Sequence, residues 1–175
     1  MDTKVINMNK GSLQRLTISA MLLAISVILG LFKIPLSQVS EIRLQFLPVA
    51  MDGMLFGPLY GGIVGALSDI LSYIVRPTGP FFPGFTISAA VQGVIYGLFL
   101  RRSSGMGRII IAQAVDSIIV SLILVPVWLM MLYGNAFIPL FIARLPKVLI
   151  MFPINTILLA AVLKPCRVWI GARLT

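Results

Sequence analysis

The sequence predicts an all-α membrane protein, with six transmembrane helices in a single bundle and both termini in the cytoplasm. Composition carries the first part of this prediction, because 59% of the 175 residues are hydrophobic and only 11% are charged. Soluble domains are about 45–50% apolar and about 25% charged. Apolar stretches long enough to cross a bilayer also recur from one end of the sequence to the other. We therefore expect residues 1–175 to form one integral domain of a cell membrane.

The first two apolar stretches predict three helices. Residues 16–32 follow a short basic segment but lack the small-residue cleavage site of a signal peptide, so we expect a retained first helix. Residues 44–75 would make a helix of about 48 Å, which exceeds the hydrocarbon thickness of about 30 Å. The sequence GPLYGG in their middle is typical of a turn. We expect two helices here, at about 43–56 and 59–76.

The second half of the chain predicts three more helices, at about 84–100, 109–133 and 141–163. They follow the connection RPTGPFFPG, whose prolines exclude a regular helix. We expect Pro126 to kink the fifth helix. With the N-terminus inside, most Lys and Arg residues lie on the cytoplasmic side, which agrees with the positive-inside rule.

Five cations depart from that rule and lie at the outer side: Lys33, Arg43, Arg76, Arg144 and Lys147. Arg144 and Lys147 are three residues apart, so they share one face of the last helix. A cation in the membrane costs about 3 kcal/mol on insertion scales. We predict that these two, with Arg43 as a third, bind an anionic small molecule, since guanidinium matches carboxylate. Alternatively, such side chains reach the interface or pair with Asp69 or Asp116.

Aromatic and amide side chains gather near the same level. The aromatic residues are Phe46, Phe81, Phe82, Phe85, Trp128 and Tyr133. Such rings are typical of an interfacial belt, but one or two can stack on a flat heteroaromatic ligand. Gln45, Gln92 and Asn155 can bind the edge of such a ring, or they can join helices by hydrogen bonds.

Several function classes are not expected. The chain has no histidine and one cysteine, Cys166, so we expect neither a His/Cys metal site nor histidine acid–base chemistry. No nucleophile stands beside a base, so we do not expect an enzyme, and no cofactor is expected. The net charge of +9 does not predict nucleic-acid binding, because the basic residues follow the membrane topology.

The energy source of a transporter is also missing from the sequence. There is no phosphate-binding loop and no clear inverted repeat. A binding subunit that obtains its energy from partner proteins fits these facts. Ala20 and Ala24 form an A-x-x-x-A pattern on the first helix, which lets a partner helix approach closely.

Three segments resemble a known family. They are LPVAMDGMLFGPLYGGIVGALSDIL (47–71), PTGPFFPGFTISAAVQGVIYGLFL (77–100) and ARLPKVLIMFPIN (143–155). In this order and spacing they resemble the membrane-embedded substrate-binding (S) components of energy-coupling factor (ECF) vitamin transporters, most closely the folate-specific branch. The resemblance implies a six-helix protein that captures folate, or a reduced folate, with high affinity from outside. It also implies delivery inward with a transmembrane coupling subunit, which meets Ala20 and Ala24, and two cytosolic ATPases.

The chemistry of folate agrees with the candidate residues. Its two carboxylates would meet Arg144, Lys147 or Arg43, and its pterin ring would stack on Trp128 or on a phenylalanine such as Phe81 or Phe82. Polar groups for the ring edge are Gln45, Asp69, Gln92 and Asn155. The resemblance implies that loops 33–43 and 77–83 cover the pocket. The alternatives are an S component for another vitamin, or a small proton-coupled transporter with the aspartates as a relay.

Overall fold

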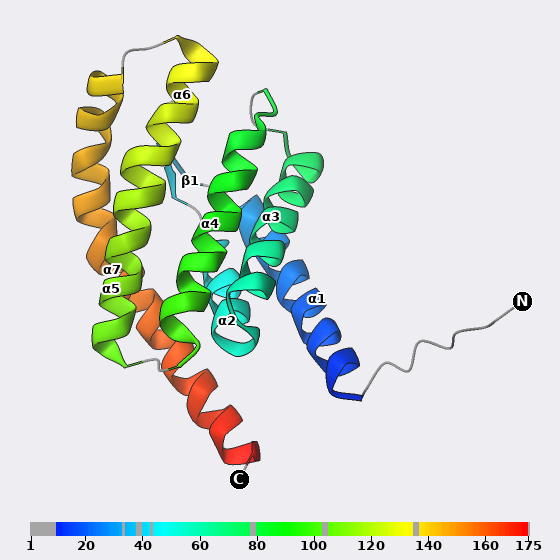
Figure 1. Cartoon of the computed structure of the whole chain (residues 1–175). Coiled ribbons are helices and arrows are strands. Elements are labelled where there is room, and N and C mark those ends of the chain that lie inside the picture. The colour runs from blue at the N-terminus through cyan, green and yellow to red at the C-terminus, as the bar shows by residue number, and fades with distance from the viewer. Residues whose placement is uncertain are drawn as a thin grey trace, which may run out of the picture.

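The computed structural model consists of helices arranged around a short central helix and a small hairpin (Figure 1). It describes residues 10–32, 34–37, 40–42, 44–77, 80–102, 105–134 and 137–174. Within these residues, five helical segments are long and apolar enough to cross a membrane. They are α1 (Lys10–Leu31), α3 (Pro58–Val75), α4 (Pro83–Leu100), the continuous run of α5 (Met106–Asp116), η1 (Ser117–Leu124) and α6 (Val125–Tyr133), and α7 (Phe137–Leu174). The sixth segment is α2 (Phe46–Phe56).

The all-α prediction is confirmed, and α2 differs from the expected full span. It has 11 residues, or about 16 Å of helix, so it crosses about half of a bilayer. Gly57 separates it from α3 with a φ of 100°, a conformation that favours glycine, and Pro58 begins α3. The chain before α2 forms an antiparallel hairpin of β1 (Ile34–Ser37) and β2 (Ser40–Ile42), which the sequence analysis did not predict.

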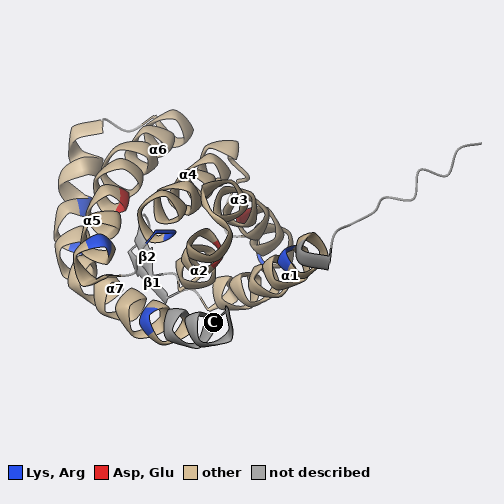
Figure 2. Cartoon of the chain, turned by 60° about the horizontal axis from the view of Figure 1, so that its bottom comes forward, with Lys and Arg blue, Asp and Glu red and all other residues tan. Residues whose placement is uncertain are grey.

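The hairpin and α2 lie inside the ring of longer helices. Figure 1 shows β1 above α2, and Figure 2 shows α2 surrounded by the other helices. The lower end in Figure 1, where α1 begins and α7 ends, is called the inner end here, because the positive-inside rule places it in the cytoplasm. Figure 2 brings this end forward and shows Lys and Arg on α1, α5 and α7.

The last two helical segments are longer than expected. The fifth begins at Met106 and contains the π-helical stretch η1, and Pro126 lies in the first turn of α6 directly after it. The sixth was expected at about 141–163 but runs over Phe137–Leu174, with Pro146, Pro153 and Pro165 inside it. Proline removes one backbone hydrogen bond, yet neighbouring helices and local adjustment allow it within membrane helices.

Helices α2, α3 and α4 pack through glycines. A Cβ on Gly93 would lie 2.0 Å from the Gly61 carbonyl oxygen, and one on Gly53 would lie 2.8 Å from the Gly97 backbone nitrogen. A Cβ on Gly65 would lie 2.3 Å from the carbonyl oxygen of Ala89. Small residues allow such close approach of helix backbones in membranes. We call Gly53, Gly61, Gly65, Gly93 and Gly97 the glycine contacts.

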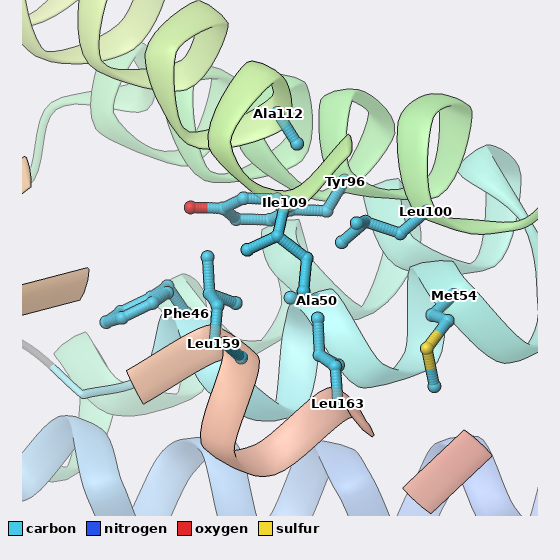
Figure 3. Packing of buried hydrophobic residues seen from close by; sticks show 10 residues of the cluster. Phe46, Ala50, Met54, Tyr96, Leu100, Ile109, Ala112, Leu159 and Leu163 are labelled. Carbon is cyan, nitrogen blue, oxygen red and sulfur yellow. The ribbon is translucent and has the colours of Figure 1, made fainter. Parts of the chain in front are cut away.

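A hydrophobic cluster packs between the helices (Figure 3). Its buried members come from α2, α4, α5 and α7: Phe46, Ala50, Met54, Tyr96, Leu100, Ile109, Ala112, Leu159, Ala160 and Leu163. Large apolar side chains on the outside are exposed, for example Leu59 (70%) and Leu149 (71%). An apolar exterior around an apolar core is expected for helices surrounded by lipid.

Candidate substrate-binding cavity

A cavity of about 340 Å³ lies above the hydrophobic cluster. Residues of α2, α3 and α4 form one wall, and residues of α5, η1, α6 and α7 form the other. Eight of the ten predicted ligand-binding residues line it: Gln45, Asp69, Phe81, Phe82, Gln92, Arg144, Lys147 and Asn155. The structure therefore brings together residues that are more than 100 positions apart in the sequence.

Two of the predicted residues are not among those that line the cavity. Arg43 lies outside the described residues. Trp128 stands behind the wall, where its Nε1–H donates a hydrogen bond to Ser88 Oγ (2.9 Å) and its ring centroid lies 5.8 Å from that of Phe82. A Cβ on Gly84 would come within 2.5 Å of both rings. Trp128 thus supports Phe82, which lines the cavity in its place.

Aromatic side chains surround the outer part of the cavity. Phe81 is 47% exposed and its ring centroid lies 5.1 Å from that of Tyr73 at the end of α3. Phe82 is half-buried and makes an edge contact with Phe85, with centroids 6.0 Å apart. Phe81 and Phe82 belong to the connection between α3 and α4, within the loop 77–83 that was expected to cover the pocket, whereas Tyr73 lies in α3 and Phe85 in α4.

The basic side chains lie part of the way down α7. Arg144 is 9% exposed and Lys147 is half-buried, and both line the cavity. Both also have interactions within the fold. Arg144 is therefore a buried cation at the cavity wall rather than a side chain that extends to the membrane interface. A carboxylate is the natural ligand for such a group.

Arg76 has a structural role that the sequence analysis left open. Its Nη1 donates a hydrogen bond to the carbonyl oxygen of Leu31 (2.8 Å), at the C-terminal end of α1. A cation there satisfies a free carbonyl and interacts favourably with the negative end of the helix dipole. Lys33 lies outside the described residues.

Gln45 and Asp69 both join helices while lining the cavity. Gln45 Nε2 donates to Ser68 Oγ (2.9 Å), and its backbone carbonyl accepts from Ser26 Oγ (3.0 Å) on α1. Asp69 Oδ2 accepts from Thr86 Oγ1 (2.9 Å), which links α3 to α4. Hydrogen bonding between helices, one of the two expectations for Gln45, is therefore present.

A polar floor closes the cavity at its inner side. We define it as Gln92, Gln113, Asp116 and Ser117, which line the cavity, together with the fully buried Tyr96. Asp116 Oδ2 accepts from Gln92 Nε2 (3.1 Å) and lies 3.3 Å from the Tyr96 hydroxyl. That hydroxyl is also 3.0 Å from Gln113 Oε1, and Gln113 Nε2 donates to Ser117 Oγ (3.3 Å). The floor is a connected network of amides, hydroxyls and one carboxylate.

Sequence reasoning missed most of this floor. Asp116 was considered only as a partner for the cations or as part of a proton relay, and Gln113, Ser117 and Tyr96 were not singled out. The spacing of these residues could have revealed the floor. Gln113 and Ser117 are four residues apart, and Asp116 lies between them on the same face of an apolar helix. Ser88, Gln92 and Tyr96 repeat every four residues on the facing helix. Two polar faces of this kind predict a shared polar site between helices.

The small residues of α1 face away from the cavity. Ala20 and Ala24 are exposed, and α1 packs against α2 and α3 on its other side. Ser19, beside Ala20, donates a hydrogen bond to Asp52 Oδ1 (2.6 Å) in the interior. The exposed strip is open to contact with another helix.

Comparison with known proteins places this fold in a family. A family model described as the ECF transporter substrate-specific component matches residues 14–163. The folate transporter FolT of Clostridium novyi (strain NT) is 40% identical over 141 residues, which cover 80% of this chain and 82% of that protein. FolT of Streptococcus mutans serotype c is 34% identical over 136 residues, which cover 73% of each protein.

Two solved structures resemble the fold closely. The crystal structure of FolT bound with folic acid matches with a TM-score of 0.77 and 31% identity, over 83% of this chain and 90% of that one. The S-component for biotin from an ECF-type ABC transporter matches with a TM-score of 0.72 and 26% identity, over 91% and 93%. On this evidence the chain belongs to the substrate-specific components of ECF transporters, which are multi-pass proteins of the cell membrane.

Proposed function

We propose that this chain is the folate-binding S component of an ECF-type importer, which captures folate or a reduced folate at its outer face. The observation that carries the proposal is the cavity itself: it combines two cations on one helix, aromatic rings near its mouth and a polar floor. Similarity to FolT proteins, and to FolT bound with folic acid, supports folate as the ligand.

The distribution of charge in the cavity suits an elongated ligand with one anionic end. Arg144 and Lys147 are the groups for the two carboxylates of the glutamate moiety, since both line the cavity. Asn155 lies eight residues further along α7 from Lys147, which is about 12 Å along a helix axis. The ring of the ligand would therefore lie between the aromatic residues and the floor, with Gln92 and Asn155 at its edge.

Import requires energy, and we propose that partner proteins supply it to this chain. Its sequence has no phosphate-binding loop, and the family is one of transport components, so we expect the ligand to be released unchanged. We propose a transmembrane coupling subunit and two cytosolic ATPase subunits as partners. The exposed strip of Ala20 and Ala24 on α1 supports this, because small residues allow close helix contact.

The first test is ligand binding by the purified chain in detergent. We expect folate to quench tryptophan fluorescence selectively, with riboflavin, thiamine and biotin as controls. Replacement of both Arg144 and Lys147 by alanine should weaken folate binding at least tenfold, or about 1.4 kcal/mol. Arg108→Ala is the matched control, because Arg108 is an exposed cation of α5 outside the cavity lining.

Each other outcome has a defined meaning. Unchanged affinity in a folded double variant would remove Arg144 and Lys147 from the site. Selective binding of biotin or another vitamin would keep the architecture and change the substrate, and the similarity to the biotin S-component makes that control informative. Folate uptake that follows the proton gradient without ATPase partners would instead support the proton-coupled alternative.

A further inference from the structure

Asp116 is a buried carboxylate in the polar floor of the cavity. It is 3% exposed and lines the cavity at the end of α5. Its Oδ2 accepts a hydrogen bond from Gln92, while its Oδ1 has no hydrogen-bond partner among the described residues. The described contacts of Asp116 include no cation. A carboxylate at this depth costs free energy unless it is matched, and an unsatisfied buried acceptor costs about 1–3 kcal/mol.

The network around Asp116 does not supply the missing donors. The Tyr96 hydroxyl has one proton and lies within hydrogen-bonding distance of two acceptors, Gln113 Oε1 (3.0 Å) and Asp116 Oδ2 (3.3 Å). The Gln113 amide donates to Ser117 rather than to the carboxylate. Asp116 Oδ1 is thus the acceptor of the floor that has no donor among the described residues, and it favours a ligand edge that presents N–H groups.

We propose that Asp116 is the specificity-determining residue of the cavity, and that it accepts hydrogen bonds from adjacent N–H donors on the ring of the ligand. This inference rests on the proposed function and names which part of a folate meets the floor. The aminopyrimidinone edge of a pterin carries a ring N–H beside an exocyclic amino group. These two parallel donors match the two oxygens of a carboxylate, in the same bidentate manner as guanidinium.

The same arrangement fixes the direction in which the ligand lies. Asp116 is the last residue of α5, which starts at the inner end with Met106, and it contacts Tyr96 of the hydrophobic cluster. Arg144 lies nearer the outer start of α7, about 10 Å from Phe137. A carboxylate at the floor repels the anionic end of a ligand, and the cations attract it. The ring therefore goes in first, with the glutamate end toward Arg144 and Lys147.

The test compares two ligands on three proteins by calorimetric titration in detergent. The ligands are folic acid and its 2-desamino-2-methyl analogue, which lacks the exocyclic donor. We expect the wild-type chain to bind folic acid at least tenfold more tightly than the analogue. Asp116→Asn should lower folic acid affinity at least tenfold and reduce the discrimination to less than threefold, because the asparagine amide places a donor against a donor.

The control is Asp52→Asn, which makes the same change at a buried carboxylate that does not line the cavity. We expect it to keep the discrimination between the two ligands. If Asp116→Asn does not fold, Tyr96→Phe is the second variant, because the Tyr96 hydroxyl lies 3.3 Å from Asp116 Oδ2 and Tyr96 does not line the cavity; it should also reduce the discrimination.

The outcomes separate this inference from the proposed function. If the wild-type chain does not bind folic acid, the proposed function is wrong and the inference is wrong with it. If the wild type binds folic acid and the analogue equally, or if a folded Asp116→Asn protein discriminates as well as the wild type, the inference alone is overturned. Equal loss of discrimination in Asp52→Asn would also overturn it, because the effect would then not be specific to the floor.

Discussion

Asp52 is a fully buried carboxylate that ties α2 to α1. Its Oδ1 accepts a hydrogen bond of 2.6 Å from Ser19, and its Oδ2 has no hydrogen-bond partner among the described residues. Loss of the donor to a buried acceptor costs more free energy than the hydrogen bond contributes to stability, because the acceptor that remains is still desolvated. Ser19 is therefore important for the position of α1, although it lies on a helix that is otherwise largely exposed.

We expect Ser19→Ala to lower the free energy of unfolding by about 1–3 kcal/mol. Thermal unfolding in detergent measures this loss, and Ser12→Ala is the matched control because Ser12 lies exposed on the same helix. A melting temperature for Ser19→Ala equal to that of the control would mean that the hydrogen bond contributes nothing to the attachment of α1.

At the residue scale, the sequence predicted the members of the cavity better than their partners. Arg144 and Lys147 were found because a cation within an apolar segment is rare and costly. The contact of Trp128 with Ser88 was not predicted, since the two residues are 40 positions apart and their meeting depends on the rotation of α4 and α6. A pattern in a single sequence shows which residues share one face of a helix. It does not show which face of a neighbouring helix packs against them.

At the scale of the element, the pairing of α3 with α4 depends on the absence of side chains at the glycine contacts. We expect Gly93→Ala to destabilise the protein by about 1–3 kcal/mol, because its Cβ would lie 2.0 Å from the Gly61 carbonyl oxygen and the helices would have to separate. Folate affinity should fall as well, since α3 and α4 form one wall of the cavity.

Gly107→Ala is the control for this substitution. Gly107 lies in α5, and a Cβ there would meet nothing within 4 Å. Because alanine has the higher helix propensity, we expect Gly107→Ala to be neutral or slightly stabilising. Comparable melting temperatures for the two variants would show that the helices can separate without loss of stability.

The boundaries of the helices were predicted where the chain carries turn residues. Gly57 and Pro58 separate α2 from α3, close to the expected turn. The hairpin before α2 was not predicted, because IPLS and SEI are too short and too mixed in composition to stand out as strands. The extension of α7 to Leu174 was not predicted either, since Pro165 and the charged residues near it resemble the end of a helix.

At the scale of the whole molecule, the cavity and the exposed strip of α1 lie on different surfaces. We expect substitution of both Ala20 and Ala24 by leucine to leave folate affinity within twofold of the wild type and to abolish uptake by the assembled importer. Larger side chains on the exposed strip would prevent the close approach of a partner helix. Binding to the purified chain and uptake into cells measure the two effects separately.

The control for this pair is Met21→Leu, a volume-conserving change at a residue that is 62% exposed on the same helix. It should leave both binding and uptake unchanged. Normal uptake by the Ala20, Ala24 double variant would exclude this strip as the contact with the coupling subunit.

The overall architecture was the most predictable feature of the protein. Apolar length set the number of helices, and the distribution of Lys and Arg set their direction, because both reflect the bilayer rather than the details of packing. The half-length of α2 was not predictable in the same way. It depends on the hairpin that lies above it, and thus on a tertiary arrangement that hydropathy does not record.

The two walls of the cavity differ in the regularity of their helices. Direct contact between backbones fixes the wall of α2, α3 and α4. The opposite wall contains the π-helical η1, followed by Pro126 in α6 and by Pro146 and Pro153 in α7, each of which interrupts regular hydrogen bonding. A ligand bound between the two walls contacts both of them, and its binding energy adds to the stability of the folded chain. As long as the ligand is bound, it is therefore part of the packed interior of the protein.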